Sequence, residues 1–545
     1  RDARKKSIGK IYINIVDKID FEPSAGTTVF GLVSSEEGPV ANVVVSDGTE
    51  VTVTDDKGIY ELKSAKKWGY VFISVPSGYE VAAEGVFPQF YQTLKGAADV
   101  VEQKDFKLTK VDGQDRYKLF LLGDMHLANR TNDAAQFTQF TTDLNAYMAQ
   151  HSGQKMYALT LGDMTWDLYW YKNNYALPQY RETINRQVKN LQIYHTMGNH
   201  DNDFMTTSDY DAAVKYVDCI GPTFYSFNIG QVHYVVMDNI DCSAYDGTDS
   251  RNYVKKLSNE QLKWLAKDLA YVDKSTPLIV AMHAQIYKPT STGFAFDHDS
   301  ANTEALLAAL DGYEVHFVTG HTHKVYNITP DDDVVKGRDI HEHNSGAICA
   351  SWWWSGNLTP GVHVSIDGAP GGYAIWDIDG TDFAWLYKST GWPEEYQFRS
   401  YDLNNVSFSM DDVPNIPSNV LIQLDYKKYV NAYPENSDNE VLIKIWNWNS
   451  NWELSVVERG KTLEYTPVWA YDPLHIAALS VPRFNNSGIT STPSFVTESA
   501  TNFFKVKADD ADVDLTITVK DEFGHTWTEE MQRPKAFSTD AYKLR

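Results

Sequence analysis

Apolar runs that end in polar residues are the feature of this chain that most limits how it can fold. Six of them occur in the middle of the sequence, at 119–122, 158–161, 193–197, 232–237, 278–282 and 315–319. Stretches with helical spacing separate them, and the clearest spans 259–271, where Ser258 and Gln261 predict a capping box. Buried strands that alternate with helices indicate a layered α/β core. In such cores ligands bind beyond the strand ends, where these polar residues fall.

The polar residues at the strand ends are of the types that bind divalent metal ions. They form five short motifs: Gly123-Asp124-Met125-His126, Gly162-Asp163, Gly198-Asn199-His200-Asp201, His283 and Gly320-His321-Thr322-His323. Each motif alone is weakly diagnostic, because a Gly-Asp after a strand is usually a turn and a lone histidine is usually a packed core residue. The set as a whole is specific. Imidazole, carboxylate and amide oxygen suit Mn, Fe, Zn or Ni, and no cysteine accompanies the motifs.

The motifs D-x-H, G-D, G-N-H-D, H and G-H-x-H, in this order, resemble those of the calcineurin-like metallophosphoesterase superfamily over residues 116–395. The resemblance implies a site for two metal ions that Asp163 bridges. Asp124, His126, Asp163 and His323 would hold one ion, and Asp163, Asn199, His283 and His321 would hold the other. His200 would stand off the metals and protonate the leaving oxygen or stabilise the transition state, and Asp201 would orient it.

One departure separates the chain from purple acid phosphatases, which are similar but carry a tyrosine three residues after the Gly-Asp aspartate. Trp166 occupies that position here and cannot ligate a metal. Their first motif also lacks the histidine that His126 supplies. A tyrosinate–iron(III) site is therefore not expected.

Three adjacent tryptophans, Trp352 to Trp354, follow the last motif. In a strand, Trp352 and Trp354 would share one face and Trp353 would point away. We expect at least one of them to line the pocket near the metals, although packing between the sheet and a third domain explains them equally well. His341 and His343, in predicted loops nearby, are further candidate substrate contacts.

The region before the central motifs is β-rich by pattern. Residues 1–19 are predicted to be a basic tail that contains one strand, over 11–16. Residues 20–110 hold short alternating strands, with Asp47-Gly48 as a hairpin signal. This stretch resembles the Ig-like modules appended to many exported enzymes, which usually serve as spacers or interaction surfaces.

The region after about residue 396 is also predicted to be β-rich, with a hairpin turn at 447–451. The stretches 346–356 and 367–373 resemble a bacterial exported branch of the superfamily that has both flanking modules. The predicted fold is therefore α/β. It has a central four-layer metallophosphoesterase sandwich at 116–395, an N-terminal Ig-like β-sandwich at 20–110 and a C-terminal β-rich domain at 396–545.

Net charge narrows the range of substrates. The 545 residues include 48 Lys and Arg against 73 Asp and Glu, a formal net charge of −25. This balance disfavours a polymeric nucleic acid or an anionic bilayer as partner, because phosphate contacts come mainly from Lys and Arg. A small phosphorylated substrate held by metal ions remains compatible with it. The three cysteines allow at most one disulfide, most plausibly Cys219 with Cys242, and a free buried thiol fits equally well.

The sequence thus predicts a phosphoesterase that uses two divalent metal ions and cleaves a phosphomonoester or phosphodiester by attack of metal-bound hydroxide. A nucleotidase-type phosphatase would share the metal set and stays open as an alternative. So does a cell-envelope glycan-binding protein in which the phosphoesterase site is vestigial. The resemblance and the absence of an initial methionine predict export to the periplasm or cell envelope. No apolar run is long enough to predict a transmembrane segment.

Overall fold

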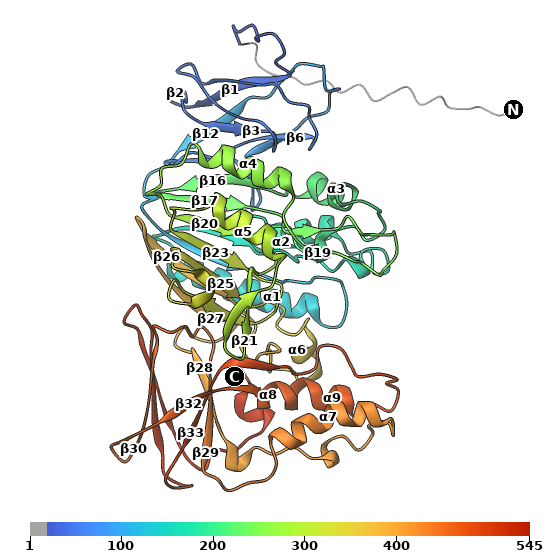
Figure 1. The fold of residues 1–545 in the computed structure, drawn as a ribbon, viewed down its shortest axis with the longest axis vertical. Helices are drawn as coiled ribbons and strands as arrows, with labels where there is room; N and C mark the ends of the chain where they lie inside the picture. The colour runs from blue at the N-terminus through green and yellow to red at the C-terminus, as the bar shows by residue number, and fades with distance from the viewer. Residues whose placement is uncertain (1–18, 545) are drawn as a thin grey trace, which may run out of the picture.

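The structure is a computed structural model that describes residues 19–544. The strand predicted over 11–16 lies outside the described residues. Three parts follow one another along the long axis of the molecule (Figure 1): an N-terminal part (β1 to β12), a central part (β13 to β27) and a C-terminal part (from β28 on). No helix within residues 19–544 is both long and apolar enough to cross a bilayer.

The N-terminal part consists of short strands in two main sheets, β11-β1-β12-β7 with β2 and β5 attached to β1, and β10-β6-β3-β4. The strands are β1 Val29–Ser35, β2 Gly38–Pro39, β3 Val44–Ser46, β4 Val51–Val53, β5 Ile59–Leu62, β6 Tyr70–Ile73, β7 Tyr79–Val81, β8 Ala83–Glu84, β9 Phe87–Pro88, β10 Tyr91–Thr93, β11 Glu102–Gln103 and β12 Phe106–Lys110. The predicted hairpin at Asp47-Gly48 is confirmed, since β3 and β4 pair antiparallel.

The N-terminal part packs closely against the central part and is more than a loosely tethered spacer. Phe90 lies against Tyr225 with ring centroids 4.5 Å apart, and Phe72 meets Trp264 edge to face at 6.1 Å. The buried residues of both parts form one continuous apolar cluster. Burial of these rings stabilises the contact by roughly 1.5–3 kcal/mol for each fully buried apolar side chain.

Two facing sheets form the middle of the central part. The first, in the order β15-β14-β13-β26-β27, holds β13 Arg116–Leu122, β14 Lys155–Thr160, β15 Gln192–Tyr194, β26 Gly372–Asp379 and β27 Asp382–Ser389. The second, in the order β16-β17-β20-β23-β25-β24, holds β16 Tyr225–Ile229, β17 Val232–Val236, β20 Leu278–Ala281, β23 Val315–Thr319, β24 Val325–Ile328 and β25 Ile340–Ser345. The strands that precede the five motifs run parallel within their sheets.

Helices cover the outer face of each sheet. On the first sheet they are α1 Asp133–Gln150, α2 Leu177–Gln187 and α3 Asp209–Cys219, and on the second α4 Asn259–Leu269 and α5 Ser300–Ala309. The alternation along β13 shows why the layers form. Leu119 and Leu121 belong to the apolar cluster between the sheets, whereas Phe120 and Leu122 belong to the cluster under α1. The predicted four-layer α/β sandwich is thus confirmed.

Helix α4 begins where the sequence predicts, but its capping box is incomplete. The Ser258 hydroxyl accepts a hydrogen bond from the backbone N–H of Gln261 at 3.2 Å. The Gln261 side chain does not return to Ser258, because it pairs with the backbone N–H and C=O of Asp238. Gln261 therefore connects the helix to the end of β17, and only the Ser258 side chain caps the helix.

The C-terminal part contains two four-stranded sheets, β28-β29-β33-β32 and β31-β30-β34-β35. The strands are β28 Phe398–Asp402, β29 Glu440–Ile445, β30 Glu453–Glu458, β31 Lys461–Leu463, β32 Tyr465–Tyr471, β33 Ser499–Lys507, β34 Leu515–Lys520 and β35 Thr526–Met531. The hairpin predicted at 447–451 is wrong, because β29 and β30 lie in different sheets. Strand β29 is buried along nearly its whole length between β28 and β33, so the turn carries the chain from one sheet to the other.

The C-terminal part also contains helices that the sequence pattern did not reveal: α7 Val420–Ala432, α8 Pro473–His475 and α9 Val481–Phe484. In α7, Ile422, Tyr426 and Tyr429 are buried, while Leu421 and Leu424 are exposed. Apolar residues on both sides of the helix hide the period of 3.6 residues that would otherwise identify it.

Candidate metal centre

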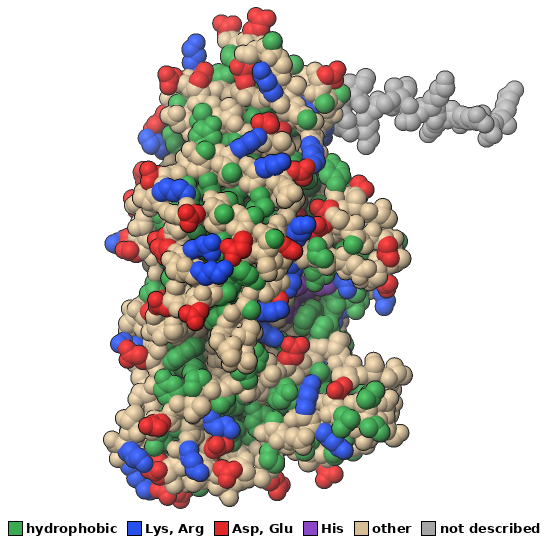
Figure 2. Space-filling view, in the orientation of Figure 1, with side chains coloured by type: hydrophobic (Ala, Val, Ile, Leu, Met, Phe, Trp, Pro, Cys, Tyr) green, Lys and Arg blue, Asp and Glu red, His purple; other side chains and the backbone are tan. Residues whose placement is uncertain are grey.

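The seven predicted metal ligands meet where parallel strands of both central sheets end. Asp124 and His126 follow β13, Asp163 follows β14, Asn199 follows β15, His283 follows β20, and His321 and His323 follow β23. All are buried except His321, which is partly exposed. On the face drawn in Figure 2, histidine side chains lie in a recess with basic side chains at its border.

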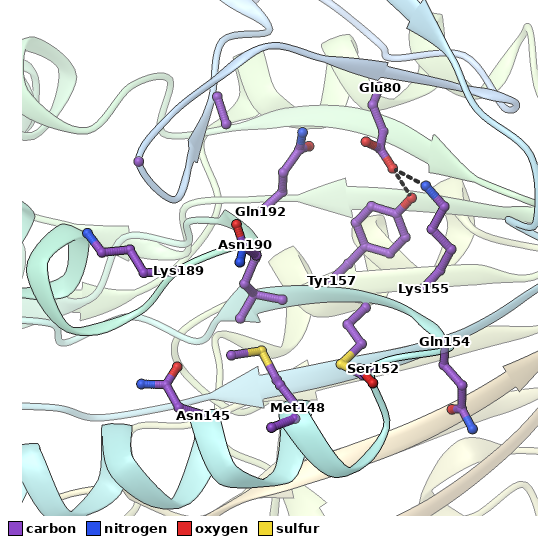
Figure 3. A pocket seen from close by; sticks show the side chains of 15 residues that line it. Glu80, Asn145, Met148, Ser152, Gln154, Lys155, Tyr157, Lys189, Asn190 and Gln192 are labelled. Atoms are coloured by element: carbon purple, nitrogen blue, oxygen red, sulfur yellow. Dashed lines mark hydrogen bonds and ion pairs between the residues drawn. The ribbon is translucent and has the colours of Figure 1, made fainter.

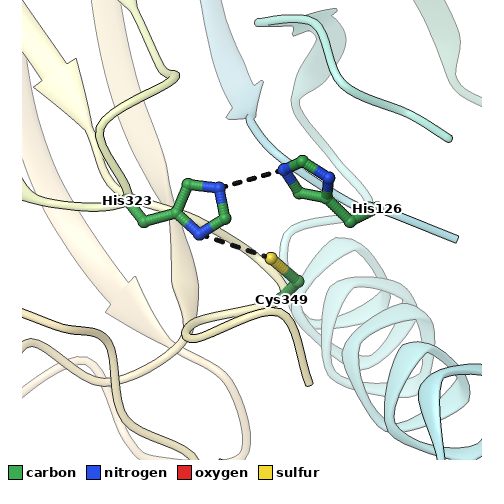
Figure 4. A group of neighbouring side chains, drawn as sticks. All are labelled: His126, His323 and Cys349. Carbon is green, nitrogen blue, oxygen red and sulfur yellow. Dashed lines mark hydrogen bonds between the residues drawn. The ribbon is translucent and has the colours of Figure 1, made fainter. Parts of the chain in front are cut away.

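One group of ligand atoms is formed by Asp124, His126 and His323. The Nε2 atoms of the two histidines face each other at 3.0 Å (Figure 4). The Asp124 Oδ1 lies 3.3 Å from Nε2 of His323. The His323 Nδ1 donates to the carbonyl of Ala350 at 2.7 Å. Because a carbonyl can only accept, the Nε2 of the neutral ring is left with a lone pair that points into the group.

A second group is formed by Asn199, His283 and His321. The His283 Nε2 lies 2.9 Å from the Asn199 Oδ1 and 3.1 Å from the His321 Nδ1. The other ring nitrogen of His283 donates to the carbonyl of Leu161 at 2.7 Å, which again leaves a lone pair facing inward.

Asp163 lies between the two groups. Its Oδ2 is 3.1 Å from the His283 Nε2 and 3.4 Å from the His126 Nε2. When deprotonated, the imidazoles present only lone pairs to the carboxylates and the amide oxygen. Burial would lower the pKa of His283 and His323, but the nearby carboxylates outweigh it, raising the pKa of His283 to about 9 and that of His323 well above its ordinary value. Protons on these two rings thus occupy the place that bound cations would take. The donor set therefore fits divalent metal ions that take nitrogen and oxygen ligands.

The carboxylates of the centre are held in the ionised form. Burial alone would raise the pKa of Asp124, but the charge of His323 and hydrogen bonds from His126 and His323 outweigh it and lower the pKa. For Asp163, burial is outweighed in the same way by His283 and His200, and its pKa is well below the usual value. Burial lowers the pKa of His126 to about 4. A ring that stays neutral at neutral pH is the form that binds a metal.

The backbone at the ligands is strained. Left-handed φ angles occur at five of them: Asp124 (53°), His126 (44°), Asp163 (55°), His321 (68°) and His323 (55°). Such angles are uncommon for residues with a side chain and concentrate at functional sites. The neighbouring glycines are required by space, since a Cβ at Gly198 would overlap the Asp163 carboxylate and one at Gly320 would overlap that of Asp124.

His200 lies at the edge of the centre and is oriented by Asp167. Its backbone N–H donates to the Asp163 Oδ1 at 2.8 Å, and its ring Nδ1 lies 2.7 Å from the Asp167 Oδ1. Arg251 forms an ion pair with Asp167, with its Nη1 2.9 Å from the same carboxylate oxygen. Asp167 itself is fully buried.

The role predicted for Asp201 as the residue that orients His200 is wrong. Its carboxylate accepts backbone N–H groups of Gly198 and Thr165, each at 3.0 Å, and of Met164 at 3.3 Å. It thereby joins the loops that carry Asn199 and Asp163. The short 3₁₀ helix Asn199–Asp201 turns its side chain back into these loops, and the 3₁₀ helix Asp167–Tyr169 brings another carboxylate to His200.

The three tryptophans do not form a strand. They lie in a turn with φ of 51° at Trp352 and 67° at Trp353, which leads into α6 (Trp354–Leu358). Trp352 stacks on the His323 ring with centroids 3.9 Å apart and so lines the centre. Trp353 is buried and donates its Nε1–H to the carbonyl of Met125. Trp354 contacts arginines instead of the ligands.

His341 and His343 were predicted as substrate contacts, and this prediction is wrong. Both lie on β25, where His341 and His343 stack on His316 of β23 with centroids 4.2 and 5.4 Å apart. This cluster packs against Trp376 and Trp385 and does not reach the ligand edge of the sheet. The His316 Nδ1 lies 3.1 Å from the His343 Nε2, and the remaining nitrogens of these two rings contact Glu314 and Asn327, so the cluster is hydrogen-bonded internally.

Several residues near the centre were not found from the sequence: Asp167, Arg251, Arg130, Phe495 and Cys349. Only Asp167 carried a usable signal in the sequence, as a carboxylate four residues after Asp163. Cys349 corrects the expectation that no cysteine is near, since its Sγ lies 3.7 Å from the His323 Nδ1 (Figure 4). That nitrogen is on the side of the ring away from the ligands. All three cysteines are free, so the disulfide between Cys219 and Cys242 does not form.

A large hollow of about 800 Å³ lies elsewhere, between the N-terminal part and the first central sheet. Figure 3 shows Glu80 at its wall, where Tyr157 donates to the carboxylate at 2.6 Å and the Lys155 Nζ lies 3.1 Å from it. Glu80 and Lys155 are thus paired with each other, and Lys189, also at the wall, donates to the backbone carbonyl of Asn185. None of the metal-centre residues lines this hollow.

Comparison with known proteins agrees with this arrangement. Three family models match in succession: the N terminal of calcineurin-like phosphoesterase over 27–111, calcineurin-like phosphoesterase over 117–325, and the C terminal of calcineurin-like phosphoesterase over 342–527. No curated protein matches the chain.

Among solved structures, a dimetal phosphatase from Danio rerio shares 12% identity at a TM-score of 0.35, covering 50% of this chain and 96% of that one. GAP50, the anchor in the inner membrane complex of Plasmodium, shares 13% identity at a TM-score of 0.32, covering 50% and 85%. These scores are too low to bear on function. The three successive family matches show that the chain belongs to the calcineurin-like phosphoesterase family, which implies metal-dependent hydrolysis of phosphoester bonds.

Proposed function

We propose that this chain binds two divalent metal ions and hydrolyses a phosphomonoester or phosphodiester by direct attack of water on phosphorus. The observation that carries the proposal is the position of Asp163, whose Oδ2 lies within 3.4 Å of a nitrogen from each ligand group. One group would be Asp124, His126 and His323, and the other Asn199, His283 and His321. The ions could be Mn, Fe, Zn or Ni.

Bound ions would supply Lewis-acid activation of the water and neutralise charge on the phosphoryl oxygens. The residues of the chain do the rest. His200 faces the centre and would give a proton to the leaving oxygen as its bond to phosphorus breaks. Asp167 holds the His200 ring in place through Nδ1, and Arg251 holds Asp167. Asp201 fixes the relative position of the two loops that carry Asp163 and Asn199.

The proposal is tested by metal content and turnover of the same sample. Protein supplied with Mn²⁺ should retain close to two ions per chain by elemental analysis and hydrolyse 4-nitrophenyl phosphate or bis(4-nitrophenyl) phosphate. Asp163→Ala should lose metal and activity together. Asp379→Asn, at an exposed carboxylate paired with Arg116, serves as the control. Wild-type protein that holds no metal and cleaves neither compound would exclude the proposed activity.

Assays on the same purified protein distinguish the proposed function from its two alternatives, a glycan-binding protein and a nucleotidase. A glycan-binding protein with a vestigial site would keep its glycan affinity in Asp163→Ala, yet every predicted ligand position here is filled by a residue able to bind metal. A nucleotidase would prefer nucleotides to simple aryl phosphates. Export to the periplasm or cell envelope stays a prediction from resemblance, to be tested by fractionating cells that produce the full-length protein.

A further inference from the structure

Two arginines from different parts of the chain approach the same tryptophan beside the metal centre. Arg130 follows the first motif, and its guanidinium lies 5.4 Å from the centroid of the Trp354 ring. Arg483, on α9 of the C-terminal part, lies 4.7 Å from the same ring. Two cations thus share one small region of a chain whose net charge is −25.

Neither arginine has a carboxylate partner within residues 19–544. The Nε and Nη1 of Arg483 and the Nε of Arg130 are buried without a hydrogen-bond acceptor among the described residues. Arg130 makes one hydrogen bond, from Nη2 to the carbonyl of Trp352 at 2.7 Å. The nearby Asp133 carboxylate is occupied by backbone N–H groups. Buried donors without acceptors cost roughly 1–3 kcal/mol each, a cost that a bound anion would remove.

The arginines are close to the proposed reaction centre. The Arg130 guanidinium lies 4.3 Å from the Trp166 ring, and that ring is 5.8 Å from the ring of the ligand His126. On the other side, Arg483 lies 5.9 Å from Phe495, which stacks on Trp352 at 4.0 Å. One or two aromatic rings therefore separate the arginines from the ligand histidines.

The backbone supports a functional role for this contact between parts. Phe495 has a φ of 65°, a left-handed angle that is a true outlier for a bulky residue. In this conformation the Phe495 ring stacks on Trp352, which itself stacks on the ligand His323, so the C-terminal part lies beside the metal centre.

We propose that Arg130 and Arg483 bind a second anionic group of the substrate, so that the substrate class is a phosphoester that carries another phosphate or a carboxylate away from the scissile bond. This rests on the proposed phosphoesterase function. The metal centre would hold the scissile phosphate, and the two guanidiniums, whose planar N–H groups match phosphate and carboxylate oxygens, would hold the distal anion.

A matched series of substrates tests the proposal. 6-Hydroxyhexyl phosphate, 6-carboxyhexyl phosphate and 1,6-hexanediol bisphosphate differ only in the distal group, and release of inorganic phosphate reports turnover. We expect kcat/KM to be about tenfold to a hundredfold higher for the compounds with a distal anion, since hydrogen bonds to charged groups are the stronger class. The ratio between the carboxylate and the phosphate compound identifies which anion the site takes.

In Arg483→Gln, kcat/KM for the compounds with a distal anion should lie within about threefold of kcat/KM for the hydroxyl compound. The value for the hydroxyl compound itself should change little. Arg483→Lys should restore part of the preference, because it keeps the charge. Arg116→Gln, at an exposed arginine far from the recess, is the matched control. An equal loss for all three substrates would assign Arg483 a packing role and overturn the proposal, as would a wild type with no preference.

Binding without turnover separates this inference from the proposed function. By calorimetry, chelator-treated wild type should bind 1,6-hexanediol bisphosphate at least threefold more tightly than chelator-treated Arg483→Gln does. If that difference is found in protein that hydrolyses nothing, the arginine site stands and the phosphoesterase function fails. If hydrolysis occurs and the difference is absent in both measurements, the arginine site fails and the phosphoesterase function stands.

Discussion

The contact between Asp167 and His200 yields the sharpest prediction about catalysis. Asp167→Asn preserves the size of the side chain and removes its charge. The carboxylate lies 2.7 Å from the His200 Nδ1 and 2.9 Å from the Arg251 Nη1, so the substitution weakens both contacts. A hydrogen bond to a charged group contributes about 1.5–3 kcal/mol. At about 1.36 kcal/mol per factor of ten, kcat/KM should fall by roughly 10- to 150-fold.

The loss should depend on the leaving group, because His200 is proposed to protonate the leaving oxygen. A nitrophenolate leaves without help, whereas a phenolate needs the proton more. Asp167→Asn should therefore reduce kcat/KM more for phenyl phosphate than for 4-nitrophenyl phosphate, with metal content unchanged by elemental analysis. Equal losses for the two substrates, or a loss explained by missing metal, would refute the role of Asp167 as the positioning residue of His200.

Asp201→Asn provides the contrast, since the sequence pointed to this residue and the structure points to Asp167. Asp201 accepts only backbone N–H groups of the ligand loops and a hydroxyl of Thr165. Its substitution should lower metal content and leave the leaving-group dependence of the remaining activity unaltered. A stronger leaving-group effect in Asp201→Asn than in Asp167→Asn would restore the assignment made from sequence.

Three further predictions concern metal binding and stability. Gly198→Ala should reduce bound metal more than tenfold by elemental analysis, because its Cβ would displace the Asp163 carboxylate; wild-type metal content would contradict this. Chelation should lower the melting temperature and Mn²⁺ should restore it, since ligands bind the folded state. Burial lowers the pKa of His316 and of His341 to about 3. The neutral rings are compatible with the folded state at full stability above the ordinary histidine pKa. As pH falls from there towards 3, the unfolded chain takes up protons that the folded protein does not, and the free energy of unfolding decreases. Each of the two histidines should therefore reduce the free energy of unfolding by up to about 2 kcal/mol at pH 5. The melting temperature of His341→Gln should fall by less than that of the wild type between pH 7.5 and 5.0.

Sequence pattern located the ligand residues because their positions follow from local rules. An apolar strand ends, a small residue allows the turn, and parallel strands bring their ends to one edge. The same rules could not show which way a side chain turns after the strand, so Asp201 was preferred to Asp167. His341 and His343 were misplaced for a related reason, since their distance from the edge depends on the register of β25 against β23.

The contacts between parts were beyond the reach of sequence pattern altogether. Phe495 and Arg483 lie more than a hundred residues after the last motif, in a region whose aromatic residues looked like ordinary packing. Only the three-dimensional arrangement shows Phe495 stacked on Trp352 and Arg483 over Trp354. Helix α7 was missed for a different reason, because apolar residues on its exposed side obscured its period.

The charge distribution explains why a chain of net charge −25 can serve an anionic substrate. An overall negative field repels phosphate at a distance, but this repulsion is screened beyond a Debye length of about 8 Å at physiological ionic strength. Close to the site, local charges decide, and there the described residues place two arginines with no carboxylate partner next to a centre suited to divalent metal ions. The C-terminal part supplies one of those arginines, so substrate selection would depend on a part of the chain that carries none of the metal ligands.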